Sequence, residues 1–450
     1  MAKRIRNGNA SRASNATRMP RKELERIGRR AFLRAAATTL AVPSIIPAAA
    51  LGSEGRPGAN GRINVGLIGA GYRARDLVIE CPNDLKLVAV ADCDLNQIDA
   101  FLAAVGKAEN QVVAEKIARY QDYRKMLSDE KLDAVFVATP THARTLICLH
   151  AMQAGMDVYA EKPLTLTIEE GQHLVRAEQK LGRICQVGTQ QRSVPINNFG
   201  SDLVRNGAIG KVNTVLCPNF PGPRPRPQLP SSPVPQGMNW DLWCNQTEPT
   251  PFSTELHPSL GKWARFREYC GWYVTGWVHA FDQIQRALGT DHTGPVEIWP
   301  EETTPDGRVT LRYASGTLLK LDLPEDKGPK MGGIFIGDKG KIEINRNRLA
   351  SNPPSLIQDA PPAADKNEYA SVSNDHIRDW VSCMRTRKTT AAPMSIGHRS
   401  TTICHLINIC RELGRKLQWD PEHEKFIGDD EAEKLKSRPR RKGFELPEIS

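Results

Sequence analysis

Between about residues 60 and 190, short apolar runs alternate with stretches in which apolar residues recur at helical spacing. The apolar runs are "INVGLI", "LKLVAVAD", "DAVFVAT", "MDVYA" and "RICQVG". The helical patterns between them cover residues 94–104, 143–154 and 168–181. Strands that are apolar along their whole length and alternate with helices are typical of a parallel sheet covered on both faces. The pattern therefore predicts an α/β fold whose first domain, residues 62–190, is a doubly wound parallel sheet.

A different pattern begins after residue 190. The strand-like "KVNTVLC" is followed by "PNFPGPRPRPQLPSSPVPQG", whose prolines prevent pairing as a central strand and predict a surface loop. The stretch "VHAFDQIQRALG" predicts a helix that ends at Gly289, and "PVEIWP", "GRVTLRYASGTLLKLDL" and "GGIFIGDKGKIEIN" predict strands and hairpins. Two more helices are expected from about Asn374 and Ser395. Residues 191–430 are thus predicted to form a C-terminal α/β domain with a mainly antiparallel open sheet, followed by a tail over residues 431–450.

The net charge of +10 lies almost entirely in the N-terminal arm. Residues 1–34 hold eleven Lys or Arg and two acids, which leaves the rest of the chain nearly neutral. The basic residues do not interleave with aromatic ones, so the sequence shows no nucleic-acid-binding pattern. With 40% hydrophobic and 25% charged residues, the composition is that of a soluble globular protein.

The arm contains "GRRAFLRAAATTLAVPSIIPAAALG", in which Arg29 and Arg30 precede a weakly apolar run that ends in three alanines. This order is typical of a twin-arginine export signal cut after Ala50. It predicts a leader over residues 1–52, a linker over residues 53–61 and a periplasmic location. The run is short and broken by prolines, so no stable membrane span is expected. The alternative is a basic, disordered leader.

The ten cysteines include no CxxC pair, so neither a disulfide framework nor a zinc ribbon is expected. Several of them stand in apolar segments, where a free thiol behaves as a small hydrophobic group. His398, Cys404 and His405 fall at no spacing typical of a zinc site and are interpreted as packed helix residues. No metal site is predicted.

The first apolar strand runs directly into a G-x-G-x-x-A turn, Gly69-Ala70-Gly71-Tyr72-Arg73-Ala74. In such a turn the first glycine permits the tight bend, the second lets the backbone approach a pyrophosphate, and the alanine lets the helix pack close to the sheet. Asp92 closes the second strand, 23 residues after Gly69, where an acid binds the ribose 2′-hydroxyl. Because that acid repels a 2′-phosphate, NAD is favoured, while Arg73 keeps NADP as an alternative.

The third strand is followed by "ATPTHA" at the edge of the sheet where doubly wound folds bind their ligands. Thr139, Pro140 and His142 are therefore expected to line the cofactor. For His142 the residues leave a second interpretation open, a helix-start residue whose ring is satisfied inside the protein.

Four blocks in the same order, "VGLIGAGYRA", "VATPTHA", "AGMDVYAEKPLT" and "QVGTQQRS", resemble the glucose–fructose oxidoreductase / inositol dehydrogenase / rhizopine-catabolism (Gfo/Idh/MocA) family. The resemblance covers about residues 60–430, and the C-terminal blocks are similar to its exported subgroup with twin-arginine leaders. It implies a Rossmann domain followed by an α/β domain that carries substrate on one side of its sheet and often a subunit partner. A homo-oligomer formed through the C-terminal sheet is therefore expected.

The resemblance also implies roles for single residues. Lys162 in "YAEKP" matches the family's active-site lysine, and Pro163 matches a proline often preceded by a cis peptide. Glu161, Lys162 and Gln190, together with Tyr72 of the glycine-rich turn, are expected at the cofactor. Lys162 and Arg192 are expected at the substrate. Spacing alone favours a solvated loop residue at Lys162, and it is the resemblance that reverses this in favour of an acid or base.

The family's second motif places an Asp four residues before a His on a helix. Here His279 stands in "VTGWVHAFD", but Thr275 occupies the position of the Asp. His279 is expected to be catalytic or to bind a substrate hydroxyl, and Asp282, one helical turn later, could replace the missing acid or cap the ring. We favour the interpretation in which Lys162 carries the proton transfer alone.

His257, with Trp263 and Arg265 nearby, is expected to line a carbohydrate pocket, with plain packing as the alternative. The sequence as a whole predicts an NAD-dependent oxidoreductase acting on a sugar, a sugar derivative or a cyclitol. Two alternatives remain: an NAD-dependent enzyme that cleaves glycosides through transient oxidation, and a catalytically weak carbohydrate-binding relative.

Overall fold

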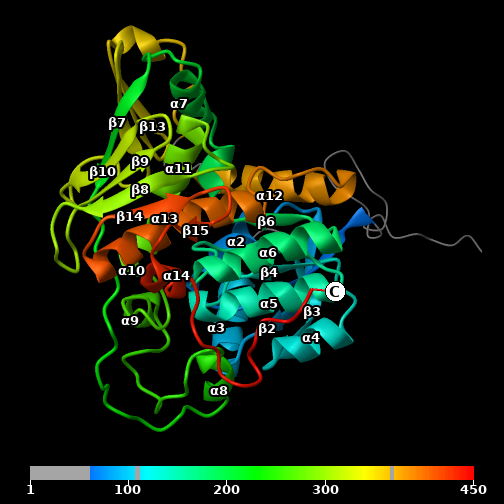
Figure 1. Ribbon diagram of the computed structural model, residues 1–450. Coiled ribbons are helices and arrows are strands. Elements are labelled where there is room, and N and C mark those ends of the chain that lie inside the picture. Colours follow the sequence, from blue (N-terminus) through cyan, green and yellow to red (C-terminus); the bar gives the residue numbers. More distant parts are fainter. Residues whose placement is uncertain (1–60, 107–111, 365–368, 450) are drawn as a thin grey trace, which may run out of the picture. The chain divides into compact units, whose positions relative to one another are not determined.

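The computed structural model describes residues 61–106, 112–364 and 369–449, with residues 369–373 described only by their backbone (Figure 1). The predicted leader and almost all of the predicted linker lie outside these residues. No helix in the described part of the chain is long and apolar enough to span a bilayer.

The first sheet is parallel and six-stranded, with the strand order β3-β2-β1-β4-β5-β6. Its strands are β1 (Ile63–Ile68), β2 (Leu85–Ala91), β3 (Val113–Tyr120), β4 (Ala134–Val137), β5 (Asp157–Ala160) and β6 (Cys185–Val187). The accompanying helices are α2 (Tyr72–Glu80), α3 (Leu95–Val105), α4 (Tyr123–Asp129), α5 (Thr141–Gln153) and α6 (Ile168–Leu181). This order is that of the doubly wound dinucleotide-binding fold, whose ligand crevice opens between β1 and β4. The predicted fold class is confirmed.

The second sheet has nine strands in the order β13-β12-β11-β7-β10-β9-β8-β14-β15. Its strands are β7 (Val212–Pro218), β8 (Pro295–Pro300), β9 (Val309–Tyr313), β10 (Leu318–Leu323), β11 (Gly333–Gly337), β12 (Gly340–Asn345), β13 (Arg348–Asn352), β14 (Leu417–Asp420) and β15 (Lys425–Phe426). Only β7 and β10 pair in parallel, so the sheet is mixed and mostly antiparallel, as predicted.

Helices accompany this second sheet before, between and after its strands. They are η3 (Gln190–Ser193), α7 (Pro195–Arg205), α8 (Trp240–Cys244), α9 (Leu260–Trp263), α10 (Trp272–Gly276), α11 (Val278–Leu288), η4 (Pro354–Ile357), α12 (Tyr369–Thr386), α13 (Met394–Leu413) and α14 (Asp430–Lys434). The Pro-rich stretch after β7 forms no helix or regular strand, as its prolines predict.

Two segments assigned by sequence to the C-terminal half pack instead on the first sheet. Trp380 of α12 is fully buried, with its ring 5.2 Å from that of Phe136 and 5.6 Å from that of Tyr159. The last residues are not a loose tail, because Phe444 is buried and Leu446 and Ile449 pack against the core beneath α5 and α6. Chain order therefore does not separate the two halves cleanly.

Trp380 gives a direct measure of how strongly α12 stabilises the first sheet. Trp380→Ala should lower the free energy of unfolding by about 3–5 kcal/mol, because it removes a large buried ring and leaves a cavity. Chemical denaturation of the full chain measures this loss. Arg378→Ala on the exposed face of the same helix should change it by less than about 0.5 kcal/mol. Similar losses in the two variants would contradict this packing.

Candidate functional site

The glycine-rich turn lies at the carboxyl end of β1, between β1 and α2. Gly69 has φ +91°, and a Cβ there would lie 2.9 Å from the carbonyl carbon of Ala138 and the backbone nitrogen of Thr139. A Cβ on Gly71 would meet no atom within 4 Å, so the turn opens into free space on its outer side. The helix α2 begins at Tyr72 without a side-chain cap, which leaves its first N–H groups available to an anion. Tyr72 itself is 79% exposed.

Asp92 follows β2 and faces this turn. Its Oδ2 accepts a hydrogen bond from the Ala70 N–H at 2.7 Å, and its Oδ1 accepts one from the Asp94 N–H at 2.9 Å. Burial raises the pKa of Asp92, although these two backbone donors oppose the shift. Each carboxylate oxygen keeps a lone pair for a further donor, so the position suits a ribose hydroxyl.

A segment from the second half of the chain covers the residues that follow Asp92. The Leu95 N–H donates to the Gly237 carbonyl at 3.0 Å, and the Asn239 N–H donates to the Cys93 carbonyl at 2.7 Å. His257 belongs to the same cover, since its Nε2 lies 3.0 Å from Asp94 Oδ2. His257 is therefore paired with Asp94, two residues after the cofactor acid, and its expected contact with substrate stays a prediction.

Arg73 and Glu161 form the charged centre of the site. Arg73 Nε donates to Glu161 Oε1 at 2.8 Å, and the Arg73 guanidinium also binds both carboxylate oxygens of Glu80. Burial alone would raise the pKa of Glu161, but the charges of Arg73 and Lys162 outweigh it and hold that pKa below its usual range. Arg73 is engaged by carboxylates of its own chain. The expectation that it contacts the cofactor, or accepts a 2′-phosphate, is therefore not supported.

Lys162 stands at the end of β5, next to Glu161. Its Nζ donates to the carbonyl of Gly276, the last residue of α10, at 3.1 Å, and its peptide bond to Pro163 is cis. Burial lowers the pKa of Lys162 below its ordinary value, against the opposing charge of Glu161. A lysine with a lowered pKa and one fixed contact is a suitable proton acceptor.

His279 lies near the N-terminus of α11, three residues beyond the carbonyl that holds Lys162. It is 4% exposed, and its Nδ1 is buried without a hydrogen-bond partner in the described residues. Burial, with the positive charges of Arg346 and Lys162, lowers its pKa well below 6.5, so the ring is neutral at neutral pH. Thr275, in place of the family's Asp, bonds to the Trp272 carbonyl at 3.2 Å and not to His279.

Arg346 was not anticipated from the sequence. It stands in the turn between β12 and β13, where sequence alone indicates only a hairpin connection. Its Nε donates to Gln191 Oε1 at 3.1 Å, and its charge lowers the pKa of both Lys162 and His279. No local sequence pattern could have suggested Arg346, because its role comes from lying opposite the "GTQQR" stretch, which is distant in the sequence.

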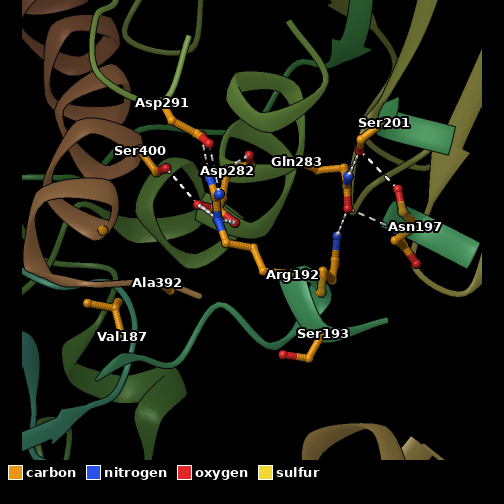
Figure 2. Close-up of polar contacts among 12 residues, drawn as sticks. Val187, Arg192, Ser193, Asn197, Ser201, Asp282, Gln283, Asp291, Ala392 and Ser400 are labelled. Atoms are coloured by element: carbon orange, nitrogen blue, oxygen red, sulfur yellow. Dashed lines mark hydrogen bonds and ion pairs between the residues drawn. The ribbon is translucent and has the colours of Figure 1, made fainter. Parts of the chain in front are cut away.

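Arg192 is buried in a network of its own (Figure 2). Its Nε donates to both oxygens of Asp282 at 2.9–3.0 Å, and its Nη2 donates to Asp291 at 2.7 Å. The Arg192 side chain is 1% exposed and is bound by carboxylates of its own chain, which gives it a structural role; its expected contact with substrate stays a prediction. Asp282 also accepts from Ser400 at 2.8 Å, which excludes it as the missing partner of His279.

A parallel set of amides extends this network, as Figure 2 shows. Gln283 donates to Ser201, and its Oε1 accepts from Asn197 at 2.9 Å and from Gln191 at 3.2 Å. Together these contacts join η3, α7, α11 and α13. They fix the helix that carries His279 to the loop that follows β6.

His142 is packed inside the protein. It is fully buried, its Nε2 lies 2.7 Å from the Trp243 carbonyl oxygen, and its ring contacts Trp243, Trp263 and Tyr269. The structure places His142 in a packed aromatic cluster, with Nε2 bonded and Nδ1 buried without a partner in the described residues, and the expected cofactor contact stays a prediction. Trp263 is likewise packed in this cluster, while Arg265 forms a surface pair with Glu255.

The remaining predicted cofactor residues surround the crevice. Pro140 precedes α5, and the hydroxyls of Thr139 and Thr189 at the ends of β4 and β6 are buried without a partner in the described residues. Gln190 donates to the Tyr159 hydroxyl at 3.1 Å and to Glu161 at 3.3 Å. Open space at Gly71, uncapped N–H groups, a ribose acid and unsatisfied hydroxyls fit a nicotinamide dinucleotide. Among the described residues no group of His, Cys, Asp or Glu side chains could hold a metal ion.

These features define a two-domain oxidoreductase with an NAD-binding Rossmann fold. The family model described as "Oxidoreductase family, NAD-binding Rossmann fold" matches residues 63–189, and the one described as "Oxidoreductase family, C-terminal alpha/beta domain" matches residues 224–446. The chain belongs to the Gfo/Idh/MocA family of oxidoreductases.

Relatives of known sequence agree. Inositol 2-dehydrogenase 4 of Saccharopolyspora erythraea is 31% identical over 59% of this chain and 67% of its own length. The scyllo-inositol 2-dehydrogenase (NAD(+)) of Bacillus subtilis is 32% identical over 31% of this chain. The match spans 38% of that relative, and 44% of an uncharacterized oxidoreductase of Rhizobium meliloti.

Solved structures share the fold. The WlbA dehydrogenase of Bordetella pertussis, in complex with NADH and UDP-GlcNAcA, superposes with a TM-score of 0.59 at 18% identity over 81% of this chain and 99% of that one. The aldose-aldose oxidoreductase of Caulobacter crescentus superposes with a TM-score of 0.54 at 18% identity over 79% of this chain and 99% of that one. At these identities the likeness concerns the fold alone.

The Arg192–Asp282 pair should act on stability. Asp282→Asn should lower the free energy of unfolding by about 3–5 kcal/mol, because it leaves a guanidinium buried with a weakened counter-charge. Chemical denaturation measures the change. The double variant Arg192→Met/Asp282→Leu should recover part of the loss, since neither charge then remains. A double variant that is less stable by the sum of the two single losses would contradict this.

Asp92 should decide which dinucleotide binds. Asp92→Ala should weaken NAD binding and improve the ratio of NADP to NAD affinity, because a carboxylate repels a 2′-phosphate and binds a 2′-hydroxyl. Titration calorimetry with both dinucleotides measures this. Tighter binding of NADP than NAD by the unmodified protein would contradict it.

Proposed function

We propose that this protein transfers a hydride between the carbinol carbon of a sugar, a sugar derivative or a cyclitol and a bound NAD, with Lys162 as general acid and base. The observation that carries the proposal is the half-buried Lys162, which lies at the same sheet edge as the dinucleotide turn and is held by the Gly276 carbonyl at 3.1 Å. The names of relatives, inositol dehydrogenases among them, support the substrate class.

The chemistry requires loss of a hydroxyl proton as the hydride leaves carbon. Bound NAD supplies the hydride acceptor. Neutral Lys162 takes the hydroxyl proton, and its lowered pKa makes this form accessible. Glu161 stays ionised, stabilises the ammonium that results and, with Arg73, keeps the end of β5 in place. His279, neutral and with a buried Nδ1 that lacks a partner, offers a hydrogen bond to a second substrate hydroxyl.

We also propose that the protein is exported by the twin-arginine route to the periplasm and retains its cofactor. The cover formed by residues 236–239 over residues 93–96 supports retention, because it must open before the ribose end can leave. We further propose a homo-oligomer formed through the C-terminal sheet. In strand β9, Leu311 is buried on the face towards the core, while Arg312 on the opposite face is exposed, which supports a surface open to a partner at that position.

Lys162→Met is the central test of function. It should leave nucleotide binding intact and cut turnover about 10²- to 10⁴-fold, the effect of a lost general acid or base. Oxidation by the unmodified protein should rise with pH as Lys162 loses its proton, and this limb should be absent in the variant. Steady-state rates from pH 6 to 10 test both. Near-normal turnover in Lys162→Met would mean that Lys162 is an ordinary loop residue. Product analysis of the unmodified protein separates the alternatives: a cleaved glycoside, and no keto product, would support the glycoside-cleaving enzyme.

His279→Ala should separate binding from chemistry. We expect KM to rise with kcat largely kept, because a neutral histidine that binds substrate stabilises ground state and transition state alike. Loss of an acid-side limb of the pH–rate profile, below the ordinary histidine pKa, in His279→Gln would instead identify His279 as the base.

Retention of the cofactor is tested on the protein as purified. Native mass spectrometry after gel filtration should find about one nucleotide per chain. Protein that emerges empty and needs added NAD, or a leader that fails to export a fused reporter, would contradict this part of the proposal.

A further inference from the structure

A second cavity of about 830 Å³ lies away from the dinucleotide turn. Its walls come from the chain after β7, from residues 246–250 and 267–271, from α13 and from the chain around α14 (Figure 1). Neither Lys162, His279 nor Asp92 lines it. It is large enough for a monosaccharide and is separate from the site described above.

Four polar atoms in the walls of this cavity are buried and have no hydrogen-bond partner in the described residues. They are Arg226 Nε, Thr250 Oγ1, Glu268 Oε2 and Asn408 Oδ1. A buried polar group left without a partner costs about 1–3 kcal/mol, so four around one cavity call for a polar occupant. One of these atoms is a donor, two are acceptors and the hydroxyl can be either, which matches a ligand bearing several hydroxyl groups.

The charge of the walls is predominantly positive. Three carboxylates, Glu248, Glu268 and Glu412, face five cations: Arg226, Arg267, Arg411, Lys434 and Arg438. Among the residues that the structure describes, Arg267 and Glu412 are the one ion pair formed across the cavity walls. Arg411 donates to the carbonyls of Gly307 and Phe220 and to the amide of Asn219, all of them neutral acceptors.

Arg438 and Arg226 both contact residues 267–268, the first through its guanidinium and the second through its backbone N–H. Arg438 Nη1 donates to the carbonyl of Arg267, and the backbone N–H of Arg226 donates to the carboxylate of Glu268 at 3.2 Å. The side chain of Arg226 makes no hydrogen bond or ion pair with any described residue. A carboxylate placed between Arg226 and Arg438 would gain charge-assisted hydrogen bonds that this chain does not itself supply.

From these contacts we infer that the cavity binds a sugar acid, a small polyol that carries a carboxylate. The carboxylate lies against Arg226 and Arg438, and the hydroxyls donate to Asn408 Oδ1, Thr250 Oγ1 and Glu268 Oε2. The inference does not rest on the proposed catalytic function, because no residue of that site lines the cavity.

Titration calorimetry of the full chain with D-glucuronate tests this, with D-glucose as the matched uncharged probe. Glucuronate should bind at one site and glucose at least tenfold more weakly, since a charge-assisted hydrogen bond is worth about 1.5–3 kcal/mol. Arg226→Gln should weaken glucuronate about tenfold or more, and Arg226→Lys should weaken it less. Arg265→Gln, a nearby surface arginine outside the cavity, should change nothing.

Asn408→Leu provides an independent variant on the opposite wall and should also weaken glucuronate binding. Lys162→Met should leave it unchanged, which separates this site from the catalytic one whatever the fate of the proposed activity. Equal binding of glucose and glucuronate, unchanged affinity in folded Arg226→Gln and Asn408→Leu, or loss of binding in Lys162→Met would each overturn the inference.

Discussion

The site depends on one buried carboxylate, that of Glu161. It lies at the end of β5 and binds the guanidinium of Arg73 at 2.8 Å, and its backbone continues into Lys162. Gln190, which follows β6, donates to the same carboxylate, so three neighbouring elements of the sheet edge meet at one group. A buried charge is tolerated only when it is paired and hydrogen-bonded, and Glu161 meets this condition through partners that are distant in the sequence. The side chain of Lys162 is therefore positioned only when Arg73 and Gln190 have bound Glu161.

A second buried charge serves the other side of the site. Arg192 sits between Asp282 and Asp291, and through Ser400 the cluster reaches α13. Because Asp282 belongs to α11, the cluster fixes the position of this helix and so of His279, which it does not contact. The clusters around Glu161 and Arg192 are alike in one respect: each holds a buried charge that is paired with residues from several helices and strands. The cost of breaking either pair is high because one partner would be left buried alone.

Much of this could be predicted from the sequence. The doubly wound sheet follows from fully apolar strands separated by helical patterns, and five of its six strands fall where those runs are. Strand β3 was missed because its sequence, "VAEKIARY", is polar and its residues are only partly buried at the sheet edge. The glycine-rich turn and Asp92 are local signals, and the structure places them where the motif requires. Helix α12 falls within the residues predicted for the C-terminal domain but packs on the first sheet, because an apolar helix face does not reveal which core it joins.

What the sequence alone determined was the class of fold, the dinucleotide turn and, through the family resemblance, the position of the lysine at a strand end. Tertiary structure decided the roles of the charged side chains. Arg192, His142 and His257 look like ligand residues in a linear chain, because the sequence shows their chemistry but not their partners. Folding places Asp282 beside Arg192, the Trp243 carbonyl beside His142 and Asp94 beside His257. It leaves His279 Nδ1 without a partner and brings Arg346 within electrostatic reach of the lysine. Whether a buried polar group is structural or available to a ligand depends on what packs against it, and those neighbours lie tens to hundreds of residues away along the chain.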